Sequence, residues 1–159
     1  MAFPDYDYTS TDFASLLIQR FYPERTDGES RIIKAFLLAH LSEFDRVTFG
    51  KRIGRGADID PTTLPAVQRA TAFSTRKRID ILAWRGPQPV IIEVKQLVDP
   101  RALGQVLTYR HHFREEFPDA PEPDLLVVGR ESDPDTLAAL AAHGVTVYLY
   151  PDAIAENPV

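Results

Sequence analysis

Residues 79–84 and 89–95 are two short apolar segments that most constrain what this chain can fold into. Both are rich in β-branched or aromatic residues, and the four residues 85–88, Arg-Gly-Pro-Gln, separate them. Two such segments around a short turn with glycine and proline are typical of a β-hairpin. The sequence therefore predicts two antiparallel strands whose side chains alternate between the two faces of a sheet.

Charged residues interrupt both predicted strands at positions that would come together. If Trp84 pairs with Pro89 across the turn, Asp80 falls directly opposite Glu93, with Cβ atoms about 5 Å apart. Lys95 follows Glu93 by two residues and projects from the same face, about 7 Å along the strand. Two acids and a lysine are therefore expected to share one patch of the sheet.

This charged patch is costly unless a further group lies in it. Opposed like charges destabilise a strand pair, and an unpaired charge inside an apolar strand is strongly unfavourable. Carboxylate oxygens at this spacing suit Mg²⁺ or Mn²⁺, and a lysine beside them could orient a water or stabilise phosphate charge. The alternative is a salt bridge with Lys95 on a solvated face. Leu82, Trp84 and Ile91 share the face with the charges, and this mixture favours a site.

The pattern around the hairpin resembles a known family. Asp80, twelve residues, then Glu93-Val94-Lys95, followed by a predicted helix with Gln105 and Tyr109, is similar to the PD-(D/E)xK nuclease superfamily. The resemblance is particularly to its RecB-type branch, whose helix carries a Gln-xxx-Tyr motif. One departure is that Ile79 stands where the family name has proline.

The resemblance covers about residues 28–150 and implies a fold, a cofactor and an activity. The fold is a restriction-endonuclease-like three-layer α/β domain with a central mixed sheet flanked by helices. The activity is hydrolysis of phosphodiester bonds in DNA with Mg²⁺ or Mn²⁺. The implied metal ligands are Asp80, Glu93, the backbone carbonyl of Val94 and, through water, Glu29. Lys95 would act on the attacking water, while Gln105 and Tyr109 would support the site and the substrate phosphate.

Length and composition exclude several classes of protein and of binding site. The chain has 159 residues, about one domain, and no cysteine, so any metal must be held by oxygen or histidine. The first eight residues are acidic and aromatic, and no apolar run is long enough for a bilayer, so we expect a cytoplasmic protein without a membrane partner. Residues 50–56 lack the Gly-Lys-Ser or Gly-Lys-Thr of a phosphate-binding loop, so we expect no nucleotide cofactor.

The charge is spread unevenly, although the net charge is only −5. Residues 46–85 contain nine basic and three acidic residues, which leaves −11 on the rest of the chain. A basic segment beside a candidate metal site is the pattern expected for contact with a nucleic-acid backbone, although a solvated basic loop has the same composition. The residues that we expect to contact phosphate are Lys51, Arg52, Arg55, Arg76 and Lys77.

The segments before the hairpin predict two helices and a strand. A short amphipathic helix at residues 10–21 is expected to form an N-terminal extension, residues 1–27, that packs on a nuclease-like domain of residues 28–159. A second helix at about residues 28–42, capped by Asp27, would place Glu29 on its core face, although an acid in the first turn also interacts with the helix dipole. A strand is expected at residues 44–49. Residues 50–56 and 58–70 are expected to be a loop or hairpin tip and an irregular segment.

The segments after the hairpin predict a helix from Asp99-Pro100 to Pro118, a strand at residues 124–129, a helix at residues 134–143 and a strand at residues 145–150. This order fits a mixed sheet flanked by helices. Gln105 and Tyr109 could also be simple edge residues of the first of these helices.

Three functional interpretations remain at this point. The first is a DNA nuclease, which could also form a homodimer. The second is a non-catalytic nucleic-acid binding module that keeps the nuclease fold. The third is a structural or regulatory protein for which neither metal nor DNA matters. The complete acid, acid and lysine set favours the enzyme.

Overall fold

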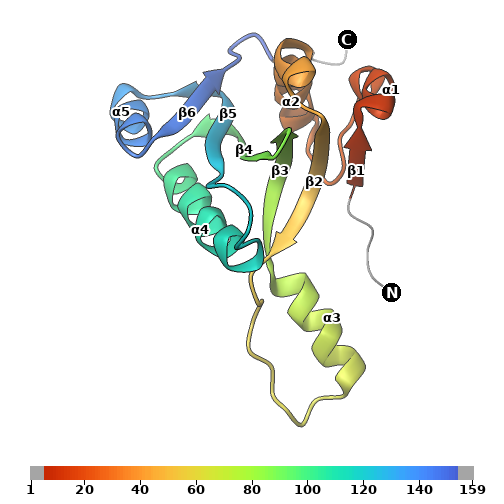
Figure 1. The fold of residues 1–159 in the computed structure, drawn as a ribbon. Helices are drawn as coiled ribbons and strands as arrows, with labels where there is room; N and C mark the ends of the chain where they lie inside the picture. Colours follow the sequence, from red (N-terminus) through yellow and green to blue (C-terminus); the bar gives the residue numbers. More distant parts are fainter. Residues whose placement is uncertain (1–5, 154–159) are drawn as a thin grey trace.

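The computed structural model describes residues 6–153, which form a six-stranded mixed sheet (Figure 1). The strands lie in the sheet in chain order: β1 (Tyr6–Thr9), β2 (Arg46–Ile53), β3 (Lys77–Arg85), β4 (Gln88–Val98), β5 (Asp124–Ser132) and β6 (Val145–Leu149). Pairs from β1 to β4 are antiparallel, whereas β4, β5 and β6 run parallel. The expectation of a mixed sheet is confirmed.

The β3–β4 hairpin has the predicted register. Trp84 pairs with Pro89, and the pairing continues as far as Ile81 and Ile92. Gly86 adopts a φ of 56° in the turn, a left-handed conformation that favours glycine. Because this register is fixed, Asp80 and Glu93 occupy the next positions of the two strands.

Helices cover both faces of the sheet. Helices α1 (Phe13–Ile18) and α2 (Asp27–His40) pack on one face, where Phe36, Phe49 and Ile81 belong to one buried apolar cluster. Helices α4 (Arg101–Glu116) and α5 (Pro134–Ala142) pack on the other face, where a second cluster includes Ile91, Val106 and Leu140. The molecule is thus an α/β protein with an open sheet between two helical layers. Among the described residues, no helix is long and apolar enough to cross a membrane.

The N-terminal segment differs from the prediction. The expected helix at residues 10–21 is a 3₁₀ turn (Ser10–Asp12) followed by the shorter α1, and the side chain of Phe21 is 53% exposed rather than part of the apolar side. The prediction also missed β1, which pairs with β2 and makes the N-terminal segment the edge of the sheet. Thr9 is the last residue of β1 and also the N-cap of the 3₁₀ turn, where it forms a capping box with Asp12. The strand therefore leads directly into the turn.

The expected strand at residues 44–49 and loop at residues 50–56 are also corrected. Strand β2 extends to Ile53, so the first part of the expected loop pairs with β3. The sequence predicts an irregular segment at residues 58–70, but α3 (Pro65–Thr75) begins within it. Helix α3 buries none of its residues, and it begins at Pro65, a residue that is favoured in the first turn of a helix.

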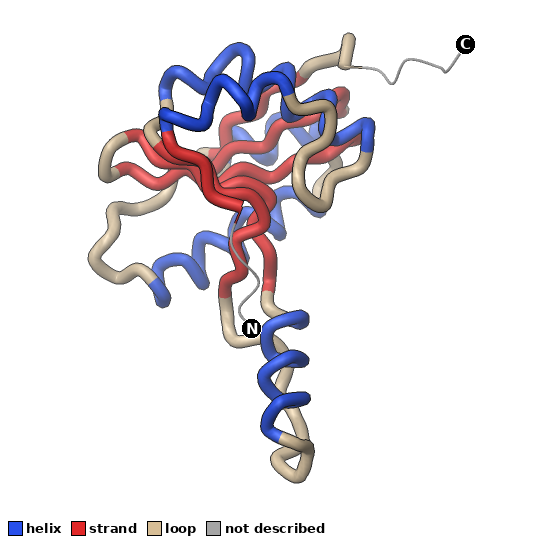
Figure 2. Tube along the Cα trace, turned by 90° about the vertical axis from the view of Figure 1, so that its right-hand side faces the viewer, coloured by secondary structure: helices blue, strands red, loops and turns tan. Residues whose placement is uncertain are grey.

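Residues 54–75, which we call the arm, project from the body of the molecule (Figures 1 and 2). Hydrogen bonds at the root of the arm hold it to the body. Arg76 donates to the carbonyl of Gly54 at 2.6 Å and pairs with Glu116 of α4 at 2.6 Å. Glu116 also accepts from the Gly54 N–H at 2.8 Å. Arg76 and Glu116 therefore fix the direction in which the arm leaves the sheet.

Candidate active site

All six predicted catalytic residues line one depression of about 410 Å³. It lies where β3 and β4 meet the start of α2, the first half of α4 and the root of the arm. The predicted residues in its lining are Glu29, Asp80, Glu93, Val94, Lys95, Gln105, Tyr109, Arg76 and Lys77. Arg25, Thr75 and Arg78 complete it. Segments far apart in the sequence thus converge on the charged end of the hairpin.

Asp80 is buried and held at both carboxylate oxygens. Its Oδ2 accepts from the backbone N–H of Val94 at 2.9 Å, and its Oδ1 accepts from Nη1 of Arg25 at 2.7 Å. The side chains of Arg25 and Asp80 are only 7% and 8% exposed. The carboxylate is therefore fixed in orientation and neutralised by a buried guanidinium.

Glu93 is the most deeply buried acid of the site, with 1% of its surface exposed. Burial and the negative charge of Asp80 raise its pKa to about 7, although Lys95 opposes the shift. Oε1 lies 3.0 Å from Nζ of Lys95, whereas Oε2 is buried without a hydrogen-bond partner among the described residues. Such an orphaned acceptor is rare in folded proteins and marks a position for a further group.

Tyr109 lies close to the two acids. Burial raises the pKa of its hydroxyl, and the negative charges of Glu93 and Asp80 raise it further. The phenol therefore stays protonated and can serve as a hydrogen-bond donor toward the acids or a substrate. Gln105, one helical turn earlier on α4, lines the same depression and lowers this pKa through a hydrogen bond.

Glu29 reaches the depression but also has a local role. Thr26, not the expected Asp27, is the N-cap of α2, and it forms a capping box with Glu29. Oε2 of Glu29 accepts from the backbone N–H of Thr26 at 3.0 Å. The sequence offered two interpretations of Glu29, a favourable interaction with the helix dipole and a site residue, and its position in the first turn of α2 and in the lining of the depression is compatible with both.

Arg25 is the site residue that the sequence did not reveal. It lies 55 residues before Asp80, in the turn between α1 and α2, and no local pattern links the two. The preceding Glu24 has a φ of 57°, which is uncommon for a non-glycine residue. This conformation lets two consecutive side chains reach β3, because Glu24 pairs with Arg78 while Arg25 pairs with Asp80.

The residues present fit a hard divalent cation. Asp80 and Glu93 supply carboxylate oxygens in one depression, which is the donor chemistry that Mg²⁺ and Mn²⁺ prefer. Glu29 lines the same depression, but the three acids, all among the described residues, do not bring ligand atoms within 4.8 Å of one another. Oε2 of Glu93 makes no hydrogen bond of ordinary geometry among the described residues, although the Tyr109 hydroxyl interacts with the Glu93 carboxylate. Val94 lines the same depression, and its N–H orients Asp80.

The predicted phosphate contacts surround the root of the arm but differ in their partners. Lys77 is exposed at the start of β3, and Arg55, 87% exposed, pairs with Asp58 on the arm. Arg52 lies over the ring of Phe73 at 5.0 Å, and Lys51 pairs with Ile79 across β2 and β3. Arg76 has the structural role described above, so its removal would also disturb the arm.

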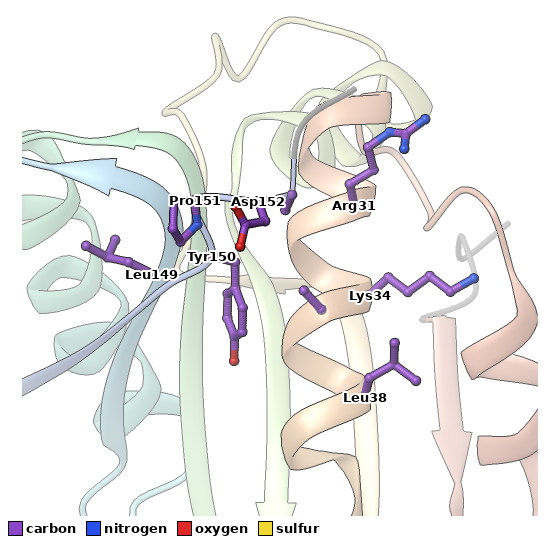
Figure 3. Close-up of a pocket in the computed structure, with 9 residues that line it drawn as sticks. Arg31, Lys34, Leu38, Leu149, Tyr150, Pro151 and Asp152 are labelled. Atoms are coloured by element: carbon purple, nitrogen blue, oxygen red, sulfur yellow. The ribbon is translucent and has the colours of Figure 1, made fainter. Parts of the chain in front are cut away.

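Two other features were not predicted. A pocket of about 530 Å³ lies between α2 and the end of β6, but Figure 3 shows Arg31 and Lys34 pointing away from Tyr150 rather than converging. His111, His112 and Glu115 form a surface group on α4 whose ligand atoms lie within 4.8 Å of one another. Neither feature places buried acidic side chains beside a lysine or an arginine, as the depression at the β3–β4 hairpin does.

Comparisons with known proteins give no assignment. No family model matches the sequence, and no curated protein matches it. One similar solved structure is the crystal structure of a protein of unknown function, AF1548, with a TM-score of 0.42 and 15% sequence identity. The similarity covers 76% of this chain and 56% of that chain. The functional conclusions below therefore rest on the geometry of this chain.

Proposed function

We propose that this protein is a nuclease with a restriction-endonuclease-like fold that hydrolyses phosphodiester bonds in DNA with Mg²⁺ or Mn²⁺. The observation that carries the proposal is the convergence of Asp80, Glu93 and Lys95 in one depression, where Oε2 of Glu93 is buried and, among the described residues, unpartnered. Arg25 and Lys95 each pair with one of the two acids in this structure, and carboxylate oxygens beside a lysine suit a site for a cation and a phosphate.

Asp80, Glu93 and the carbonyl of Val94 would hold the cation, with Glu29 acting through water. When bound, the cation would supply positive charge for the phosphoryl oxygens and lower the pKa of a water. Arg25 would have to share Asp80 or leave it. Val94 keeps the Asp80 carboxylate oriented through its N–H, at 2.9 Å in this structure.

Lys95 would orient the attacking water or stabilise the oxyanion that develops on phosphorus. Its Nζ lies 3.0 Å from Oε1 of Glu93 and its side chain is 30% exposed, so it reaches the open part of the depression. Tyr109, held protonated by its surroundings, would donate to the phosphate or to Glu93. Gln105 would position Tyr109.

Arg55, Arg76 and Lys77, which we call the basic rim, would position the DNA backbone. Arg76 and Lys77 lie in the lining of the depression itself, and the exposed Arg55 lies on the arm, where it pairs with Asp58. A backbone held along this rim would bring a phosphodiester to Lys95 and the acids.

The test is cleavage of supercoiled plasmid, linear duplex and single strands, each with and without Mg²⁺ or Mn²⁺. We expect cleavage of at least one of these DNAs that needs the metal and is lost in Glu93→Gln. Arg20→Gln is a control for a substitution outside the site, since Arg20 lies after α1 and outside the lining of the depression. Cleavage that persists in Glu93→Gln would refute the proposed active site.

A nucleic-acid binding module without turnover is the second candidate. It is favoured by one observation: Arg25 and Lys95 each neutralise one acid, so the site is electrically balanced without a metal. A protein that binds DNA equally with and without Mg²⁺ and cleaves none of the three forms would support this candidate.

A further inference from the structure

We propose that Arg25 is a built-in competitor of the divalent cation, so that metal enters the site only when the guanidinium releases Asp80. This inference rests on the proposed function, because it concerns how the same site is loaded. It assigns a role to the N-terminal turn, which the sequence pattern of the hairpin does not include.

Arg25 contacts Asp80 directly. Nη1 of Arg25 lies 2.7 Å from Oδ1 of Asp80, and both side chains are more than nine-tenths buried. The other oxygen of Asp80 is engaged by the Val94 N–H. A cation that approaches Asp80 therefore meets a carboxylate whose accessible charge is already neutralised.

Arg25 cannot give up its charge. A guanidinium remains protonated under all ordinary conditions. A divalent cation and a guanidinium at the same carboxylate repel each other strongly in a site with little solvent screening. Loading the metal therefore requires movement of Arg25 rather than its deprotonation.

Only one of the two terminal nitrogens of Arg25 contacts Asp80. Nη2 of Arg25 is buried and has no hydrogen-bond partner among the described residues. A guanidinium that served only to anchor this carboxylate would be expected to bind it with both prongs of its fork. The contact with one prong leaves a desolvated donor, which lowers the cost of moving the side chain away.

The turn is built to stay in place while the Arg25 side chain moves. Its backbone is held by the Arg25 N–H, which donates to the carbonyl of Tyr22 at 3.1 Å. The neighbouring Glu24 pairs independently with Arg78 of β3. The long side chain of Arg25 can therefore rotate without unfolding the segment that joins α1 to α2.

The test measures Mn²⁺ affinity by titration calorimetry and by electron paramagnetic resonance, without any substrate. The variants are Arg25→Gln, Asp80→Asn and the control Arg78→Gln, which removes a positive charge from the same depression and the Glu24 contact of the same turn, but no contact with Asp80. If Arg25 holds Asp80 about nine-tenths of the time, its removal should tighten Mn²⁺ binding about tenfold. Arg78→Gln should change it far less, and Asp80→Asn should abolish it.

The outcomes separate this inference from the proposed function. Binding by wild type that is lost in Asp80→Asn but no tighter in Arg25→Gln than in Arg78→Gln would overturn the competition and leave the metal site standing. Absence of Mn²⁺ binding in wild type and Arg25→Gln alike would overturn both.

A second measurement needs no folded Arg25→Gln protein. In wild type labelled with ¹⁵N, the side-chain Nε resonance of Arg25 should move on titration with Mg²⁺, with the same midpoint as metal binding. Arg25→Lys assigns that resonance by its loss, and the Nε resonance of Arg78 is the internal reference. An Arg25 resonance that stays fixed while the metal binds would overturn the proposal.

Discussion

Lys95 and Glu93 project from the same face of β4, and Nζ of the lysine lies 3.0 Å from Oε1 of the acid. The lysine thus contacts a proposed metal ligand, yet it cannot be a ligand itself, because an ammonium only donates hydrogen bonds. This relationship separates the part of the site that would hold the cation from the part that would act on the phosphate.

Replacing Lys95 with alanine should lower turnover about 10²-fold or more, on the scale of a lost general base or oxyanion donor. Affinity for DNA should change far less, since one phosphate contact among many is a small part of binding. Single-turnover cleavage at pH 8, beside a binding isotherm in Ca²⁺, measures both quantities. Cleavage by Lys95→Ala at the wild-type rate would remove Asp80, Glu93 and Lys95 as an active site.

The pH dependence should follow Glu93, whose pKa is raised to about 7. Metal binding needs the ionised carboxylate, so the apparent Mn²⁺ affinity should fall up to about tenfold for each pH unit below 7 and level off above it. Calorimetry between pH 5.5 and pH 8.5, extending about 1.5 units on either side of this value, tests this. An affinity that is constant below pH 7 would show that Glu93 is not a ligand.

The same shift affects the stability of the metal-free protein. Because the folded-state pKa lies above the ordinary value of 4.5, the folded state binds the proton more tightly than the unfolded state. The free energy of unfolding of wild type, relative to Glu93→Gln, should therefore fall by roughly 2–4 kcal/mol as the pH rises from below 4.5 to above 7. Urea unfolding of both proteins in EDTA measures this, and a rising difference would contradict it.

Replacing Asp80 with asparagine should abolish the heat of Mn²⁺ binding and also destabilise the metal-free protein. The destabilisation, about 3–5 kcal/mol, comes from leaving the buried guanidinium of Arg25 without its partner. The double variant Asp80→Asn/Arg25→Gln should lose less stability than the two single variants together, because the unpaired charge is gone. Additive losses would mean that the two side chains do not interact in solution.

The basic rim predicts how DNA binding depends on salt. Removing Arg55 and Lys77 should weaken binding to all sequences alike and reduce the slope of log K against log salt by about 0.9 for each lost duplex phosphate contact. Arg20→Gln serves again as the control from outside this segment. An unchanged slope in Arg55→Gln/Lys77→Gln would mean that the rim faces away from DNA.

The orientation of the arm can be tested at Gly56. A Cβ at this position would lie 2.3 Å from the carbonyl oxygen of Ala72, so Gly56→Ala should displace α3 and weaken DNA binding without changing Mn²⁺ affinity. Gly86→Ala is a matched control, since Gly86 also has a positive φ but a Cβ there would meet no heavy atom of the described residues within 4 Å. Equal DNA affinity for Gly56→Ala and Gly86→Ala would exclude a role of the arm in binding.

The sequence predicted the hairpin register because a short Gly-Pro turn leaves few ways to pair two strands, and Trp84 does pair with Pro89. It also predicted a core face for the helix at about residues 28–42, and Ile33, Phe36 and Leu37 of α2, which follow a helical period, are buried. The positions of Asp80, Glu93 and Lys95 in one depression follow from these two successes together with the helix that carries Gln105 and Tyr109.

The sequence could not predict features that depend on contacts between distant segments. Arg25 reaches Asp80 across 55 residues, and nothing near Arg25 in the sequence indicates this partner. Strand β1 has only four residues, and it exists because β2 offers an edge for pairing. Helix α3 buries none of its residues, so no core contact marks where it begins within a segment that contains two prolines.

Because α3 buries none of its residues, the arm should tolerate insertions and deletions better than the body. The body depends on two apolar cores, one on each face of the sheet, whereas the arm depends on a few contacts at its root. Local opening of the arm should expose its amides to hydrogen exchange long before those of the sheet. Insertions or deletions near the tip would therefore leave the core intact, so evolution can alter the reach of the arm without rebuilding the pocket beneath it.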